Sequence, residues 1–296
     1  MKFSFIGLGQ MGKPIALNLL KNESDFIACD INEDVLTDIK DKGIKTTISD
    51  NEAADADIIF LCLPDTYVVE EVLISKNGII DLLKEGQIIV DFSTISYLSA
   101  VKIADILEKK GVEFLDAPIS GRKSRAEEGT LAIMCGGKEE IYNKVKPYMD
   151  YMGNQIVYMG KSGNGQLSKM INNCIYDINI AGIAEMLPFA VKLGLDPEKI
   201  GQVINNGTGR SNASEFFIPN MLERNFSYGF TMNKAYKDLV SAAEVSSKMS
   251  IPLPVLNAAT LTYQMALLKG YGDDYKGAMI QVYEELLGVK YEKKND

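Results

Sequence analysis

Short apolar runs alternate with amphipathic segments through the first half of the chain. The runs are brief and rich in Ile, Val and Phe, which is typical of buried strands in a parallel sheet. They predict strands at Lys2–Ile6, Phe26–Cys29, Ile58–Leu61, Ile88–Phe92, Phe114–Asp116 and Leu131–Cys135. Helical spacing between them predicts helices at Lys13–Lys21, Glu33–Lys42, Val68–Ile74, Ser99–Lys110 and Lys138–Met152. This alternation indicates an α/β fold with a doubly wound parallel sheet.

The second half of the chain has a different pattern, which starts after a glycine-rich turn at 160–165. Apolar residues at helical spacing predict one long helix at Gln166–Leu193, which Pro188 would kink. Shorter helices are predicted at Pro197–Asn205, Ser211–Leu222, Lys234–Lys248, Leu253–Lys269 and Gly277–Leu287. We therefore expect two domains: an α/β domain at 1–162 and an all-helical domain at 163–296, joined by the long helix.

A glycine-rich loop joins the first predicted strand to the first predicted helix. Its residues are Gly7, Leu8, Gly9, Gln10, Met11 and Gly12. The first glycine permits a tight turn, the second lets the backbone approach a pyrophosphate, and the third lets the helix pack on the strand. The helix N-terminus supplies the positive end that phosphates need. This context predicts a Rossmann-type dinucleotide-binding domain, although a glycine-rich turn without a ligand can have the same spacing.

Asp30 ends the second predicted strand, 18 residues beyond the last glycine of the loop. A carboxylate at this place accepts hydrogen bonds from ribose hydroxyls and would repel the 2′-phosphate of NADP. The residues that follow, Ile31 and Asn32, add no cation, whereas an NADP site favours an arginine. The sequence therefore predicts NAD in preference to NADP, with these three residues in the cofactor site. A single aspartate at a strand end is otherwise an ordinary helix cap.

Composition narrows the chemistry, because the 296-residue chain contains no histidine. This excludes Ser-His-Asp and Cys-His catalysis, His-ligated zinc and any histidine proton carrier, and we expect no metal site. A proton must move through Lys, Tyr, Cys, Asp or Glu. The net charge of -9 argues against a nucleic-acid or anionic-membrane partner. Four widely spaced cysteines, no signal-peptide pattern and no uncharged apolar span lead us to expect a cytoplasmic protein.

Polar groups follow several predicted strands, at the edge where ligands bind in doubly wound sheets. Leu63-Pro64 and Thr94 end two of these strands, and we place them in the cofactor site. A later loop, Ser120-Gly121-Arg122, offers hydroxyl, backbone and guanidinium donors, which match a substrate carboxylate. Each of these segments read alone is also compatible with a simple turn.

The long helix contains Lys169 and Asn173 at i and i+4, with Asp177 one turn further, so the three share one stripe. A lysine in a partly apolar crevice has a pKa closer to neutrality, which suits proton transfer. A polar stripe toward solvent or a subunit boundary is the alternative. Tyr142 and Lys146 match the Tyr-x-x-x-Lys spacing of another dehydrogenase class, but we interpret that match as accidental because the helix looks peripheral.

Taken together, five ordered motifs along the whole chain resemble the β-hydroxyacid dehydrogenase family. They are FIGLGQMGKPIALNLL, DFSTIS, DAPISG with EEGTLAIMCGG, GNGQLSKMINN and KDL. The resemblance implies an NAD(P)-dependent interconversion of a small 3-hydroxy acid and its semialdehyde or oxo acid. It implies that Lys169 is the general acid/base and that Asn173 and the Ser120-Gly121 backbone hold the substrate. It further implies that Thr94 and Lys237 lie near the nicotinamide, and that the helical domain forms dimers or tetramers.

The substrate loop departs from the family pattern, which has glycines where this chain has Arg122 and Arg125. This difference puts a plain hydroxyisobutyrate substrate in doubt and suggests a substrate with a second anionic group, bound by Arg122. Two other functions stay open from the sequence. One is a non-catalytic NAD(H)-binding sensor or scaffold, and the other is an imine or keto reductase of related fold.

Overall fold

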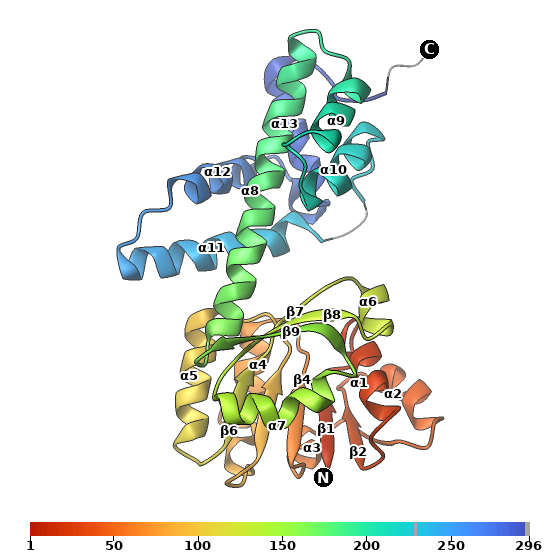
Figure 1. Cartoon of the computed structure of the whole chain (residues 1–296), viewed down its shortest axis with the longest axis vertical. Helices are drawn as coiled ribbons and strands as arrows, with labels where there is room; N and C mark the ends of the chain where they lie inside the picture. The colour runs from red at the N-terminus through yellow and green to blue at the C-terminus, as the bar shows by residue number, and fades with distance from the viewer. Residues whose placement is uncertain (228–229, 294–296) are drawn as a thin grey trace. The chain divides into compact units, whose positions relative to one another are not determined.

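A computed structural model describes residues 1–227 and 230–293 of the chain (Figure 1). The chain divides into two compact units, Met1–Lys169 and Met170–Asp296. We call them the nucleotide unit and the helical unit and describe each by itself. The predicted domain boundary at 162–163 lies just before the long helix, which begins at Asn164, and it stays a prediction.

The nucleotide unit is built on one mixed sheet. Its strands are β1 (Phe3–Ile6), β2 (Phe26–Cys29), β3 (Lys45–Thr47), β4 (Ile58–Leu61), β5 (Ile88–Asp91), β6 (Glu113–Asp116), β7 (Ile119–Ser120), β8 (Leu131–Gly136) and β9 (Gly153–Gly160). The order is β3-β2-β1-β4-β5-β6-β8-β7, with β9 paired to β8, and the first six strands are all parallel. The chain adds β2 and β3 on one side of β1 and then β4, β5 and β6 on the other side, as in a doubly wound sheet. The predicted fold class is therefore confirmed.

Helices cover both faces of this sheet, as Figure 1 shows. They are α1 (Gly12–Leu20), α2 (Glu33–Lys40), α3 (Asp50–Ala53), α4 (Thr66–Ile74), α5 (Tyr97–Glu108), α6 (Lys123–Glu127), α7 (Glu139–Met149) and the short 3-10 helix η1 (Ile79–Asp81). One apolar layer packs α1, α2 and α7 against one face, and a second packs α3, α4 and α5 against the other. Both faces of the parallel strands are therefore buried, which explains their near-continuous apolar runs.

The sequence did not predict β3, β7, β9, α3 or α6. β7 has only two residues, and α6 has five, too few to show a periodicity. β9 contains the exposed polar residues Asn154 and Gln155, so it lacks the apolar run that marks the central strands. β7 and β9 both pair with β8, and β3 pairs with β2, so these strands are defined by their neighbours more than by a pattern of their own.

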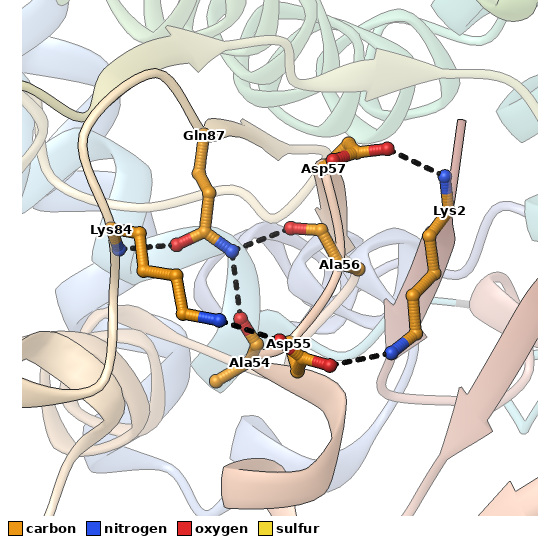
Figure 2. A network of polar contacts seen from close by, with 7 residues as sticks. All are labelled: Lys2, Ala54, Asp55, Ala56, Asp57, Lys84 and Gln87. Carbon is orange, nitrogen blue, oxygen red and sulfur yellow. Dashed lines mark hydrogen bonds and ion pairs between the residues drawn. The ribbon is translucent and has the colours of Figure 1, made fainter.

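A polar network links the segments that precede β1, β4 and β5, at the amino ends of these strands (Figure 2). The amide of Gln87 donates to the carbonyl oxygens of Ala54 and Ala56 at 2.8 and 2.6 Å. Its oxygen accepts the backbone N–H of Lys84 at 2.5 Å. Asp55 binds the ammonium groups of Lys2 and Lys84 at 2.7 and 2.8 Å. This network lies at the edge opposite the carboxyl ends of the strands, where the loops of the candidate site begin.

The helical unit contains α9 (Pro197–Asn206), α10 (Asn212–Leu222), α11 (Met232–Met249), α12 (Pro254–Leu268), η2 (Tyr271–Asp273), η3 (Lys276–Met279) and α13 (Ile280–Leu287). Most of α8 (Asn164–Lys192) also belongs to it. Its core contains the fully buried Phe217, Tyr263 and Tyr291. The long helix was predicted two residues late, and it continues through Pro188 without interruption.

One helix in the described residues, α8, is long and apolar enough to cross a membrane by length and composition. Half of its most apolar window is buried inside the protein, and its middle contains the buried Asp177. These features are typical of the core helix of a globular unit.

Candidate active site

The glycine loop presents open backbone at the carboxyl end of β1. Gly7 has a φ of +92°, and a Cβ there would come within 2.4 Å of the Cys62 carbonyl oxygen. A Cβ on Gly12 would lie 1.9 Å from the carbonyl oxygen of Gly7, so both positions need glycine to close the turn. Gly9 meets nothing within 4 Å, and no side chain caps the N-terminus of α1 at Met11. An open approach beside an uncapped helix N-terminus fits a pyrophosphate.

Asp30 lies directly beside this loop. One carboxylate oxygen accepts the backbone N–H of Leu8 at 2.6 Å, and the other accepts that of Asn32 at 2.9 Å. The carboxylate is thereby held at the end of β2, next to the residues that would surround a dinucleotide. The neighbouring Ile31 is 86% exposed. This placement agrees with the predicted cofactor site, and the ribose contact itself stays a prediction.

The loops after β4 and β5 are tied to each other. The backbone N–H of Leu63 donates to the hydroxyl of Ser93 at 2.8 Å, and Asp91 accepts the backbone N–H of Ser93 at 2.9 Å. Pro64 and Thr94 are exposed at this edge. The structure therefore brings the predicted residues Leu63, Pro64 and Thr94 to one edge of the sheet.

Two residues that the sequence analysis passed over fix the start of α8. The carboxylate of Asp116 accepts the backbone N–H groups of Gly163 and Gln166 at 2.7 and 2.9 Å. The buried side chain of Gln166 accepts the backbone N–H of Ile95 at 3.0 Å and donates to the carbonyl of Ser93 at 2.7 Å. These bonds join α8 to the loop that contains Thr94. Lys169 follows Gln166 by three residues on the same helix and is half-buried.

Two buried carboxyl groups near the ends of these strands, those of Asp91 and Asp116, have raised pKa values. Burial raises the pKa of Asp91 to about 7, although its hydrogen bonds with Ser93 oppose the shift. Burial likewise raises the pKa of Asp116 to about 6, against the backbone N–H groups of α8. Oδ2 of Asp91 is buried and has no hydrogen-bond partner among the described residues, which favours the protonated carboxyl compared with an exposed aspartate.

The predicted substrate loop follows β7. Gly121 has a φ of +151°, and a Cβ there would lie 2.6 Å from a methyl group of Leu131, so a side chain would strain the turn. The exposed Arg122 occupies the N-cap of α6. Arg125 has a different role, because its guanidinium donates to the carbonyl of Thr130 and closes the loop. The two arginines that the sequence analysis treated together are therefore distinct.

In the helical unit, the amide of Asn173 donates to the carboxylate of Asp238 on α11 at 2.8 Å. Lys237, the predicted cofactor contact, is exposed on the same helix. Asp177 accepts hydrogen bonds from Lys276 and from the hydroxyl of Tyr263 and is fully buried. Asp177 is therefore part of the helical core. The polar stripe is split between a buried ion pair and half-buried residues.

The Tyr-x-x-x-Lys match has no site around it. The ring of Tyr142 stacks on Tyr158, with centroids 5.0 Å apart. Lys146 forms an ion pair with Asp150 one turn further along α7, at 2.7 Å. Tyr142 and Lys146 lie on a helix that covers the sheet, and each of them has a structural partner.

Comparison with known proteins agrees with this geometry. Residues 2–160 match the NAD binding domain of 6-phosphogluconate dehydrogenase, and residues 163–283 match a domain described as NAD-binding of NADP-dependent 3-hydroxyisobutyrate dehydrogenase. This chain belongs to the β-hydroxyacid dehydrogenase family. It is an NAD(P)-binding oxidoreductase, as the resemblance of its motifs implied.

Individual members of the β-hydroxyacid dehydrogenase family match nearly the whole chain. The chain is 36% identical to 2-(hydroxymethyl)glutarate dehydrogenase of Eubacterium barkeri, covering 98% of this chain and 97% of the relative. It is 37% identical to 2-hydroxy-3-oxopropionate reductase of Escherichia coli, covering 98% and 99%. The structure of Mycobacterium tuberculosis 3-hydroxyisobutyrate dehydrogenase with L-serine aligns with a TM-score of 0.83 at 28% identity, covering 95% of this chain and 98% of that one.

Proposed function

We propose that this β-hydroxyacid dehydrogenase interconverts a small 3-hydroxy acid and its semialdehyde, with Lys169 as the general acid/base. The observation that carries the proposal is the anchoring of the helix turn that precedes Lys169. Through Gln166 and Asp116, the first turn of α8 is hydrogen-bonded to the strand-end loops that also contain Thr94. A lysine fixed beside the dinucleotide edge of the sheet is well placed to exchange a proton with a substrate hydroxyl.

Each candidate residue would have its own part in the reaction. The N-terminus of α1 and the open backbone at Gly9 would hold the pyrophosphate. Bound nicotinamide supplies the hydride acceptor. Lys169 in its neutral form takes the hydroxyl proton during oxidation, and its ammonium returns that proton to the alkoxide in the reverse direction. Asn173, one helical turn further along α8, would hold the same hydroxyl.

We propose NAD in preference to NADP. Both oxygens of Asp30 already accept backbone hydrogen bonds beside the glycine loop, so the carboxylate is fixed at the place where a 2′-phosphate would lie. A fixed negative charge repels that phosphate and accepts hydrogen bonds from the ribose hydroxyls of NAD.

For the substrate we propose a hydroxymethyl carboxylate with a second anionic group, bound by Arg122. The name of the Eubacterium barkeri relative contains such a compound, 2-(hydroxymethyl)glutarate. It shares with 3-hydroxyisobutyrate a carboxylate next to a carbon that bears a hydroxymethyl group, and it adds a second carboxylate on a flexible arm. A guanidinium at the rim of the substrate loop matches that arm.

We further propose that the protein works as a cytoplasmic homodimer or tetramer formed through the helical unit. Several large apolar side chains of that unit are exposed, including Ile171 and Ile175 one turn apart on α8, at 50% and 56%. A second copy of the chain would bury them.

The test of the function is turnover in Lys169→Ala. We expect the wild type to reduce NAD with 2-(hydroxymethyl)glutarate or 3-hydroxyisobutyrate, followed by NADH absorbance. Loss of general acid/base catalysis lowers kcat by about 10²–10⁴-fold, while the Kd of NADH stays within about twofold. Lys161→Ala, at an exposed lysine before α8, is the control and should keep its activity. Wild-type binding of NADH without turnover of any hydroxy acid or semialdehyde would favour the sensor alternative.

A further inference from the structure

The carboxamide of Asn173 is held from one side by a second residue. Its Nδ2 donates to Oδ2 of Asp238 at 2.8 Å, across 65 residues of sequence and from α8 to α11. Both residues are half-buried and lie within the helical unit. Of the KDL motif, only Lys237 has a predicted role, and none was predicted for Asp238.

The chemistry of the pair fixes the direction of the amide. A carboxylate can only accept hydrogen bonds, whereas an amide has a donor end and an acceptor end. The NH₂ group of Asn173 must therefore face Asp238, and its carbonyl oxygen is turned the other way. That oxygen accepts a long hydrogen bond of 3.3 Å from the amide of the exposed Asn172, which a better donor can replace.

The backbone around the pair is held as well. The thiol of Cys174 lies 3.8 Å from the carbonyl oxygen of Asp238, which links the same turns of α8 and α11. One turn further, the buried Asp177 accepts hydrogen bonds from Lys276 and from Tyr263 on α12, the latter at 2.9 Å. With both helices fixed at this level, the remaining freedom of Asn173 is the rotation of its side chain, and Asp238 removes it.

We infer that Asp238 is a positioning residue, which orients the Asn173 amide so that its oxygen accepts the hydrogen bond of the substrate hydroxyl while the Lys169 ammonium donates to the hydroxyl oxygen. When Lys169 is neutral, that same proton passes to the lysine. This inference rests on the proposed function of Asn173 and adds a direction to it. An amide oriented this way recognises an alcohol. The opposite orientation would present the NH₂ group, which matches a carboxylate or an aldehyde oxygen.

The test isolates the hydroxyl of the ligand. 2-(Hydroxymethyl)glutarate and 2-methylglutarate differ only by that hydroxyl, and 3-hydroxyisobutyrate and isobutyrate form a second such pair. With NADH bound, none of the four acids can be oxidised, so their Kd values can be measured by titration. In the wild type we expect the hydroxyl to tighten binding by about tenfold, the upper end for one hydrogen bond.

Asp238→Asn should reduce this hydroxyl preference to about twofold or less, because an amide at 238 can pair with either end of Asn173. Asp238→Glu keeps an acceptor and should retain most of the preference. Cys174→Ala removes the other contact between the same helix turns, and it should keep the full preference even where it lowers the melting temperature. A purely structural role of Asp238 predicts that the preference does not follow the acceptor at 238.

The outcomes separate the two ideas. If Asn173→Ala loses the preference and Asp238→Asn keeps it, the positioning role is wrong and the proposed function stands. If Asn173→Ala itself keeps both preference and turnover, the role of Asn173 in the proposed function is wrong. Equal binding of the hydroxy and deoxy acids by the wild type would also overturn the inference.

Discussion

Three neighbouring cations in the substrate loop have three different environments. The guanidinium of Arg125 donates to the Thr130 carbonyl within the loop. Lys123 pairs with Glu127 one turn along α6, at 3.4 Å. Arg122 is exposed at the N-cap of the same short helix, next to the turn that requires glycine at 121. Arg122 is the residue for which we propose a contact with the second anionic group of the substrate.

Substrate selectivity tests this assignment. Arg122→Ala should lower kcat/KM for 2-(hydroxymethyl)glutarate by about tenfold, the scale of one charge-assisted hydrogen bond at an exposed site. For 3-hydroxyisobutyrate, which lacks the second carboxylate, we expect less than about twofold. Lys123→Ala removes the adjacent charge and is the matched control, with little effect on either substrate. Equal losses for both substrates in Arg122→Ala would show that the arginine does not bind the second anion.

The buried carboxyl of Asp91 gives a pH-dependent stability. Its folded pKa of about 7 lies above the ordinary 3.8, so the folded protein holds a proton that the unfolded chain releases. The resulting stabilisation is present in acid and is lost as the pH rises from about 4 through 7. Asp91→Asn removes the titration. Between pH 5 and 8, urea unfolding should show the variant gaining on the order of 2–3 kcal/mol relative to the wild type. A pH-independent difference would mean that Asp91 is ionised in the folded state.

At the scale of elements, a buried glutamine side chain binds backbone groups at each of the two ends of the parallel strands. Gln166 binds two backbone groups at the carboxyl edge, and Gln87 binds three at the amino edge (Figure 2). Both side chains are buried. Only Gln166 belongs to the helix that contains Lys169, so the two positions separate stability from catalysis.

We expect Gln166→Met and Gln87→Met each to lower the free energy of unfolding by about 1–3 kcal/mol, because methionine leaves buried backbone groups unpaired. Only Gln166→Met should also lower kcat, by about tenfold or more, since a loosened α8 displaces the proton donor. Urea denaturation and steady-state kinetics on both variants check this. A comparable loss of kcat in Gln87→Met would assign the effect to general destabilisation.

The sequence predicted the elements whose signal is local. The buried parallel strands were placed to within one residue, because burial on both faces leaves an apolar run at β2, β4 and β5. The glycine loop was found because Gly7 and Gly12 close a turn that has no room for a Cβ. Asp116, Gln166 and Asp238 were missed for the opposite reason. Their partners lie 47 or more residues away, so a carboxylate or amide of this kind reads as an ordinary cap or surface group.

At the scale of the whole molecule, exposed apolar side chains are concentrated on the helical unit. On α12, Leu261 and Met265 lie one turn apart and are 59% and 39% exposed, and on α11 Val240 is 46% exposed. With the two isoleucines of α8, they give several helices of one unit an apolar outer surface. A surface of this kind is typical of an interface, and the proposed partner is a second copy of the chain.

The mass in solution tests this directly. By size-exclusion chromatography with light scattering, the wild type should have at least twice the chain mass of 32.6 kDa. The double variant Leu261→Glu/Met265→Glu should shift toward the monomer, because two charges in an apolar contact leave their carboxylates desolvated. Leu82→Glu, at a position 46% exposed in the nucleotide unit, should leave the mass unchanged. A wild type that stays monomeric at every concentration would contradict the assembly, and the exposed apolar helices would then need another partner.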